Sequence, residues 1–129
     1  MTESEVKFVE SMKLKYEQLN SKENFKEKWK DEKFKILLNP KDSDHAALIS
    51  VEKGNISVQG IKNNPKNNIE KESLNWDALM QTTLEIFAQM NEGKLSRGDI
   101  TKKMITGKIK LKNPTFLAKL SDLDALLKE

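Results

Sequence analysis

The chain has 129 residues, a length that predicts a single domain able to bury a hydrophobic core. Its composition is 36% hydrophobic and 33% charged, and 23 basic residues against 20 acidic ones leave a net charge of +3, which does not by itself indicate nucleic-acid binding. Cysteine is absent, which excludes disulfides, thiolate catalysis and cysteine-ligated metals.

The ends of the chain carry no recognisable targeting signal. The opening MTESEVKFVE lacks a basic segment followed by an apolar run. No apolar stretch approaches the ~20 residues of a membrane span. The last three residues, Leu127-Lys128-Glu129, are not the peroxisomal Ser-Lys-Leu. We therefore expect a cytoplasmic protein.

Two amphipathic helices are predicted at the start of the chain. Residues 3–20 repeat apolar side chains at steps of three and four, and residues 23–31 place Phe25 and Trp29 on one side of a mostly charged helix. The apolar side of the first helix consists of Val9, Met12, Tyr16 and Leu19.

Short strands are predicted next. Residues 34–38 form a strand that stops at Asn39-Pro40, and residues 45–52 and 55–61 form a hairpin around Gly54, which tolerates a positive φ. In this hairpin Ile56 and Val58 can pair across to Ile49 and Val51. Residues 63–68 are rich in turn formers, and residues 69–72 form a brief edge strand.

The longest helix is predicted over Trp76–Met90, capped by Ser73 or Asn75. At 100° per residue, its apolar side chains cover an arc of roughly 160°. So wide an arc suits contact with both a sheet and another helix, or the wall of a cavity. The arc consists of Trp76, Leu79, Met80, Thr83, Leu84, Ile86, Phe87 and Met90.

The C-terminal third predicts a helix, a strand and a helix. Ser96 and Asp99 have the spacing of a capping box before a short helix through Ile100, Met104 and Ile105. Residues 106–112 alternate apolar and lysine side chains, as a half-buried strand does. Asn113 and Pro114 then begin a last helix, whose apolar side is Phe116, Leu117, Leu120 and Leu123.

This order of elements predicts an α+β fold, with a mostly antiparallel sheet covered by helices. The single domain 1–129 divides into a helical part (1–31), strands (32–72), and helices with one returning strand (73–129).

A family resemblance rests on three motifs of the C-terminal third: Gly93-Lys94-Leu95, Gly107-Lys108-Ile109-Lys110-Leu111 and Leu117-Ala118-Lys119-Leu120. Together they resemble the C-terminal signature of the sterol carrier protein type two family, over about a quarter of the chain. The resemblance implies a five-stranded sheet with helices on one face and an apolar tunnel between the layers.

Catalysis is poorly supported, so we expect a protein that is not an enzyme and needs no cofactor. His45, the only histidine, lies beside Asp42, Ser43 and Asp44, but no G-x-S-x-G supplies a nucleophile. One histidine, no cysteine and no patterned carboxylate loop give no support to a metal site. Neither glycine-rich phosphate motif is present.

A basic stretch stands out near the C-terminus: Lys94, Arg97, Lys102, Lys103, Lys108, Lys110 and Lys112 lie within twenty residues. A solvated sheet face is one interpretation and is the one favoured by sequence alone. Attraction to an anionic membrane surface, or to a ligand's phosphates, through Lys102, Lys103, Lys108, Lys110 and Lys112 is the other. Nucleic acid is not expected, because exposed aromatic side chains are missing among the lysines.

The remaining candidate site is apolar. Without the resemblance, an ordinary packed core is the favoured interpretation of these side chains. The resemblance favours a pocket for a flexible aliphatic ligand, to which methionine adapts well. The predicted ligand-binding residues are Trp76, Leu79, Met80, Thr83, Phe87, Met90, Met104, Ile105, Phe116, Leu120 and Leu123.

The predicted function is non-catalytic lipid binding or transfer in this tunnel, for a fatty acid, a fatty acyl-CoA, or a sterol- or isoprenoid-like ligand. Residues 123–127 are the predicted lid. The alternative is an interaction or dimerisation module of the same fold with a filled core, which would form homodimers.

Overall fold

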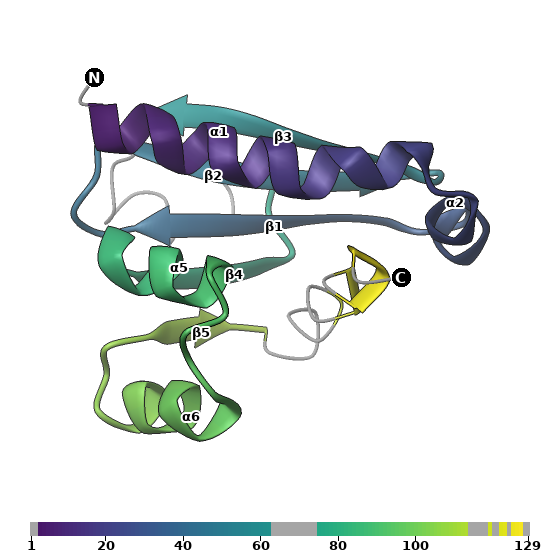
Figure 1. Cartoon of the computed structure of the whole chain (residues 1–129). Coiled ribbons are helices and arrows are strands. Elements are labelled where there is room, and N and C mark those ends of the chain that lie inside the picture. Colours follow the sequence, from purple (N-terminus) through teal and green to yellow (C-terminus); the bar gives the residue numbers. More distant parts are fainter. Residues whose placement is uncertain (1–2, 63–74, 114–118, 120–121, 124, 128–129) are drawn as a thin grey trace.

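The computed structural model describes residues 3–62, 75–113, 119, 122–123 and 125–127 (Figure 1). Its helices are α1 (Glu3–Glu17), the 3-10 turn η1 (Gln18–Ser21), α2 (Glu23–Trp29), α5 (Leu84–Asn91) and α6 (Arg97–Ile105). Its strands are β1 (Lys33–Pro40), β2 (His45–Glu52), β3 (Asn55–Lys62), β4 (Ala78–Thr82) and β5 (Lys110–Lys112). An α+β fold with a five-stranded sheet is therefore confirmed.

The sheet has the strand order β3-β2-β1-β4-β5 and is mixed. Strand β4 runs parallel to β1, whereas the β1–β2, β2–β3 and β4–β5 pairs are antiparallel. The prediction of a mostly antiparallel sheet is corrected accordingly. Residues 73–129 also contribute two strands, β4 and β5, where one was expected.

The predicted hairpin and its turn are confirmed, and the structure gives the register of the pairing. Val58 pairs with Ile49 and Ile56 with Val51. The turn places Lys53 and Gly54 at φ 50° and 75°. Gly54 also lies against α2: its N–H donates to the Trp29 carbonyl at 3.1 Å. A Cβ there would lie 3.1 Å from the Lys26 carbonyl oxygen, so a side chain meets both strain and crowding.

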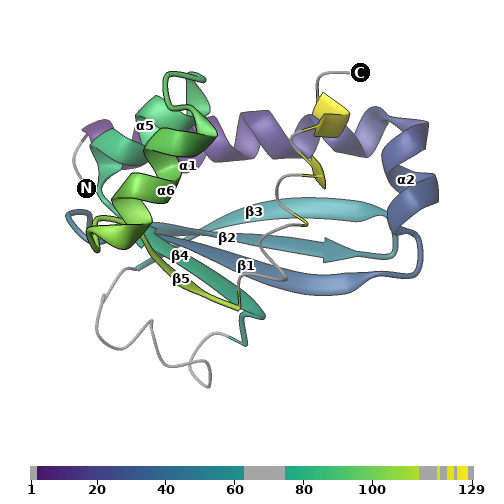
Figure 2. The ribbon, with the colours of Figure 1, turned by 90° about the horizontal axis from the view of Figure 1, so that it is seen from below.

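The helices that the structure describes lie on one face of the sheet (Figure 2). The predicted apolar sides of the first two helices face the sheet, and the ring centroids of Trp29 and Phe34 lie 5.5 Å apart across the interface. From the strands, alternate residues such as Ile36 and Ile49 complete this main core. Buried helical members are Phe8, Met12, Tyr16, Leu19, Phe25 and Trp29.

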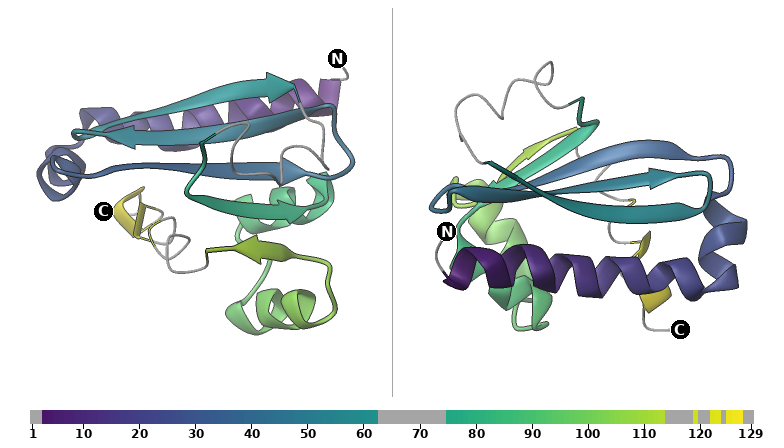
Figure 3. Two further views of the ribbon diagram at one scale, coloured as in Figure 1. Left: turned by 180° about the vertical axis from the view of Figure 1, so that it is seen from behind. Right: turned by 90° about the horizontal axis from the view of Figure 1, so that it is seen from above.

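The opposite face of the sheet, seen from behind in Figure 3, carries a second and smaller apolar cluster. Its buried members are Leu37, Ala46, Leu48, Trp76 and Leu79. The central strands therefore have apolar side chains on both faces, and every residue of β4 is buried.

The predicted helix over Trp76–Met90 is wrong in its first half, because residues 78–82 form β4 and the helix starts only at Leu84. A strand buried on both faces is a continuous apolar run, which periodicity cannot distinguish from a buried helix. The cap is Thr83, not Ser73 or Asn75: its Oγ1 accepts the Ile86 N–H at 3.2 Å.

Smaller corrections concern strand ends. Strand β1 continues through Asn39 to Pro40, two residues beyond the predicted stop. Strand β5 covers only Lys110–Lys112 of the predicted 106–112, because Gly107 takes φ 79° in a turn after α6. The predicted loop 63–68, the edge strand 69–72 and residues Pro114, Phe116, Leu117 and Leu120 of the last helix lie outside the described residues.

Strand β3 is an edge strand whose outer backbone groups are partly covered by side chains. The Asn20 amide Nδ2 donates to the Ile56 carbonyl and its Oδ1 accepts the Ile56 N–H, both at 2.8 Å. Glu17 Oε2 accepts the Val58 N–H at 2.9 Å. These contacts stand in for a neighbouring strand and limit edge-to-edge association.

Described residues of the C-terminal segment belong to the main core. Leu123 and Leu126 are buried, and Lys22 Nζ donates to the Leu126 carbonyl at 3.2 Å. The Lys119 ammonium lies 3.1 Å from Glu32 Oε2 and 5.3 Å from the ring centroid of Trp29. Two residues of the predicted lid, Leu123 and Leu126, are thus core residues.

We expect Asn20→Ala to lower the free energy of unfolding by about 1–2 kcal/mol, because both backbone groups of Ile56 lose their partner. Urea denaturation measures the loss. The control is Gln18→Ala, since the exposed Gln18 amide bonds only to the Lys15 carbonyl within the same turn. Equal stabilities of the two variants would contradict the bridging role of Asn20.

We expect Lys119→Met to lower the free energy of unfolding by about 1 kcal/mol, through the lost ion pair and the lost cation–π contacts. The control is Lys33→Met, whose ion pair with Glu52 joins two exposed side chains. Thermal unfolding of both variants compares them. A Lys119 variant as stable as the control would show that this contact does not anchor the C-terminal segment.

Candidate functional site

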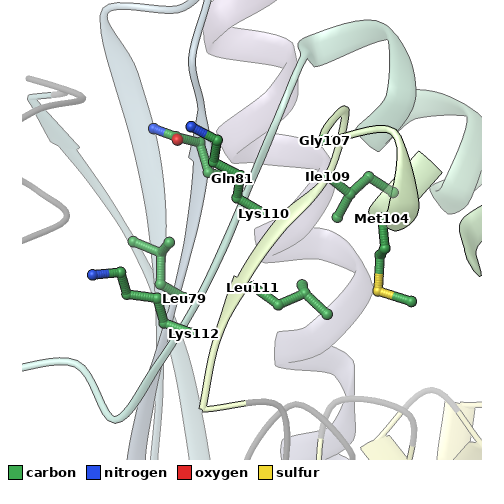
Figure 4. A pocket seen from close by; sticks show the side chains of 8 residues that line it. All are labelled: Leu79, Gln81, Met104, Gly107, Ile109, Lys110, Leu111 and Lys112. Atoms are coloured by element: carbon green, nitrogen blue, oxygen red, sulfur yellow. The ribbon is translucent and has the colours of Figure 1, made fainter.

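A cavity of about 420 Å³ lies at the β5 edge of the sheet, beside α6 (Figure 4). Its size is within the range of small-molecule sites. Residues of β4, α6 and β5, and of the turn between α6 and β5, line it: Leu79, Gln81, Met104, Gly107, Ile109, Lys110, Leu111 and Lys112.

The cavity extends over the edge strand and has two different halves. Ile109 belongs to the main core, and Met104 and Leu111 pack against that core, so this half is apolar and lies on the helix side. Leu79 belongs to the second cluster on the opposite face. Lys112 pairs with Leu79 and Lys110 with Gln81, and directly opposed residues share a face. Figure 4 shows these four side chains on the other side of the strand.

Helix α6 makes stabilising hydrogen bonds at both of its ends. The predicted capping box is confirmed: Asp99 N–H donates to Ser96 Oγ and Ser96 N–H to Asp99 Oδ2, both at 3.1 Å. These hydrogen bonds hold the pKa of the Asp99 carboxyl below its usual range. At the other end, the Ile109 N–H donates to the Lys103 carbonyl at 3.1 Å, which directs Ile109 back into the core.

The turn after α6 is tied to strand β4. Thr82, fully buried, donates its hydroxyl to the Lys108 carbonyl at 2.8 Å. At the far end of β5, the Asn113 amide donates to the Asp77 carbonyl at 2.6 Å. The lining of the cavity is thus attached to β4 at both ends of β5.

The charged side chains of the lining are all positive. Lys110 and Lys112 contribute two positive charges, Gln81 contributes a neutral amide, and no carboxylate is among the lining residues. The cationic side chains lie across β5 from the apolar half formed by Met104, Ile109 and Leu111.

The predicted ligand-binding residues do not surround one space, because β4 distributes them over both faces of the sheet. Trp76 and Leu79 lie on the face opposite to the described helices. Met80, Phe87 and Leu123 are buried in the main core, against which Met90 and Met104 pack. Thr83 caps α5, and Ile105 is 80% exposed. Phe116 and Leu120 lie outside the described residues.

Of the predicted residues, Leu79 and Met104 line the cavity, and several lining residues were missed. The missed apolar ones, Ile109 and Leu111, were predicted on one face of a strand. That alternation was a usable signal that they face a space beside α6. Gln81 could not have been found, since its residue range was assigned to a helix.

A second hollow of about 400 Å³ separates α1 from α5. Its floor includes Phe8, whose ring centroid lies 5.1 Å from that of Phe87. Its rim is polar, with Ser11, Glu85 and Asn91 among the lining residues.

Catalytic and metal-binding features were also sought in the described parts of the chain. No cluster of three or more histidine, aspartate or glutamate side chains there could hold a metal ion. The backbone N–H of His45 donates to Ser43 Oγ at 3.1 Å, a local contact at the start of β2. Of the helices described, none is both long and apolar enough to cross a bilayer.

Comparison with known proteins gives structural likenesses only. No family model matches the chain, and no curated protein sequence is significantly similar to it. The structure is similar to UbiJ-SCP2, a ubiquinone synthesis protein, with a TM-score of 0.61 and 8% sequence identity over 99% of this chain and 96% of the other.

The fold also resembles part of the stereoselective inverting sec-alkylsulfatase Pisa1 from Pseudomonas sp., with a TM-score of 0.53 and 17% identity over 78% of this chain. A double mutant of the same sulfatase gives a TM-score of 0.56 at 16% identity over 76%. The chain spans 14% of the length of these sulfatase chains. At such low identities these likenesses concern the fold, and along nearly its whole length the chain has the fold of a sterol-carrier-type (SCP2) domain.

Proposed function

We propose that the chain binds an apolar, lipid-like ligand without chemical conversion, in the cavity at the β5 edge. The observation that carries the proposal is the cavity itself, in which Met104, Ile109 and Leu111 form an apolar wall beside two lysines. The likeness to UbiJ-SCP2 over the whole chain supports the same function.

The driving force would be the transfer of an aliphatic chain out of water, worth roughly 0.8 kcal/mol per buried methylene. The flexible Met104 side chain can adapt to ligands of different shape. A fatty acid, a fatty acyl-CoA, or a sterol- or isoprenoid-like molecule fits this chemistry, and the name of the ubiquinone synthesis protein favours the isoprenoid class. No covalent step is required, so the proposed function is carriage, presentation or buffering, for which we propose a cytoplasmic setting.

The alternative function is an interaction or dimerisation module with a filled core. It is favoured by the close burial of Met80, Phe87 and Leu123, which were expected to contact ligand and instead pack in the main core. This alternative predicts a stable dimer in light scattering and a flat titration with any lipid.

We expect Met104→Trp to weaken binding of a fluorescent fatty acid at least about tenfold, because the indole would occupy the apolar half of the cavity (about 1.4 kcal/mol). Titration in the absence of vesicles measures the affinity. The control is Glu27→Trp, a position on α2 whose side chain is 83% exposed and is not among the lining residues of this cavity, which should leave binding unchanged.

Two different results would contradict the proposal in different ways. Wild-type affinity in the Met104 variant would place the ligand elsewhere, with the hollow between α1 and α5 as the next site to test. A flat titration of the wild type, with a bare mass in native mass spectrometry of the fresh protein, would contradict lipid binding altogether. A discrete added mass, extracted and identified, would name the ligand class.

A further inference from the structure

One exposed apolar side chain lies at the end of α6. Ile105 is 80% exposed, and Leu14 on α1 is the other large apolar residue so exposed among those the structure describes. Met104, one position earlier, packs against the core, so Ile105 points about 100° away from it around the helix. Such a side chain contributes nothing to the core of the protein.

Five lysines lie near this side chain at the same end of the molecule, and two of them, Lys103 and Lys108, line a hollow with Glu85 and Gln89 of α5. Lys102 lies one turn before Ile105 on α6, Lys103 follows Lys102, and Lys108 lies in the turn that leads to β5. Lys110 and Lys112 continue the charge along the edge strand. We call the end of the molecule that carries Ile105 and these five lysines the basic tip. Lys110 and Lys112 lie on the side of β5 opposite to Met104 and Leu111, so the lysines of the tip are distributed over both sides of the edge strand. Residues 100–112 contain no acidic residue, and none of the described salt bridges involves these lysines. The carboxylate of Asp99, in the first turn of α6, interacts electrostatically with Lys102 and Lys103 and offsets one of the five charges.

The basic tip is at an end of the molecule and beside the cavity. Helix α6 lies beyond β5, away from the long hairpin of β2 and β3 (Figure 1). Met104 lies one residue before Ile105 in the chain, and Gly107 lies two residues after it. Both line the cavity together with Lys110 and Lys112. A surface that bound the basic tip would therefore lie next to the cavity.

We propose that the basic tip docks the protein on an anionic phospholipid bilayer, with the lysines at the head groups and Ile105 inserted among the acyl chains. Lysines near such a surface are attracted to it electrostatically, and an apolar side chain among them adds hydrophobic anchoring. The charge complementarity selects anionic over neutral lipid. The docking does not require the proposed ligand, although it would place the cavity at the membrane.

A nucleic acid would also attract lysines, but the exposed isoleucine distinguishes the two partners. Single-stranded nucleic acid is bound by cationic grooves with aromatic side chains on which bases stack, and the basic tip has an aliphatic side chain instead. Phosphate recognition alone gives no reason for Ile105 to be exposed.

The test is co-sedimentation of the ligand-free protein with vesicles of phosphatidylcholine and phosphatidylserine, or of phosphatidylcholine alone. Two tip variants are compared with matched controls. Lys102→Gln with Lys108→Gln is matched by Lys13→Gln with Lys53→Gln, two exposed lysines elsewhere that give the same change in net charge. Ile105→Ser is matched by Leu14→Ser. Far-UV circular dichroism checks that each variant is folded.

We expect the wild type to sediment with the anionic vesicles only, and less so as salt is raised. The tip double variant should lose about fivefold in partitioning per lysine, and its control much less. Ile105→Ser should lose binding severalfold while Leu14→Ser does not.

Three results would overturn the proposal: no sedimentation of the wild type, equal loss in tip and control variants, or loss in the lysine variant with none in Ile105→Ser. The last, together with tighter binding to a single-stranded oligonucleotide than to vesicles, would identify a nucleic-acid surface. A flat lipid titration in solution with intact vesicle binding would contradict only the ligand cavity.

Discussion

The parallel pairing of β4 with β1 places the C-terminal half of the protein. β4 lies directly beside β1, with Leu79 opposite Leu37 and Met80 opposite Leu38. One of these residues therefore faces the helices and the other the opposite side of the sheet. A slip of one residue would exchange the side chains that enter the main core with those of the second cluster, so the shapes of the two packed clusters hold the register. Strand β5, the cavity and the basic tip all depend on where β4 ends.

The cavity follows from how the short strand β5 is attached. Thr82 and Asn113 tie the two ends of the β5 region to β4, while the capped helix α6 is connected to it through the Gly107 turn. The edge strand therefore has an apolar flank under α6 and a cationic flank on the other face. The opposite edge of the sheet is different, because Asn20 and Glu17 already occupy backbone groups of β3.

Local sequence signals were sufficient to predict many of the structural elements. The apolar repeats of α1 and α2, the hairpin around Gly54 and the capping box of Ser96 and Asp99 were all predictable, because each depends on neighbours in the chain. The motif around Gly107–Leu111 also indicated the fold, which is confirmed. Within the candidate site, Leu79 and Met104 were predicted and Ile109 was placed on the correct side of its strand.

The sequence alone thus determined the fold class, most of the element order and a basic stretch with one strand beside it. Only the tertiary structure decided which face each apolar residue occupies. Residues 78–82 form a run that is equally compatible with a buried helix and a strand buried on both faces, and pairing with β1 selects the strand. That selection separates Leu79 from Met80, and it brings Lys110 and Lys112 beside a cavity. The exposure of Ile105 was likewise invisible in the sequence, because it depends on how α6 packs rather than on any local pattern.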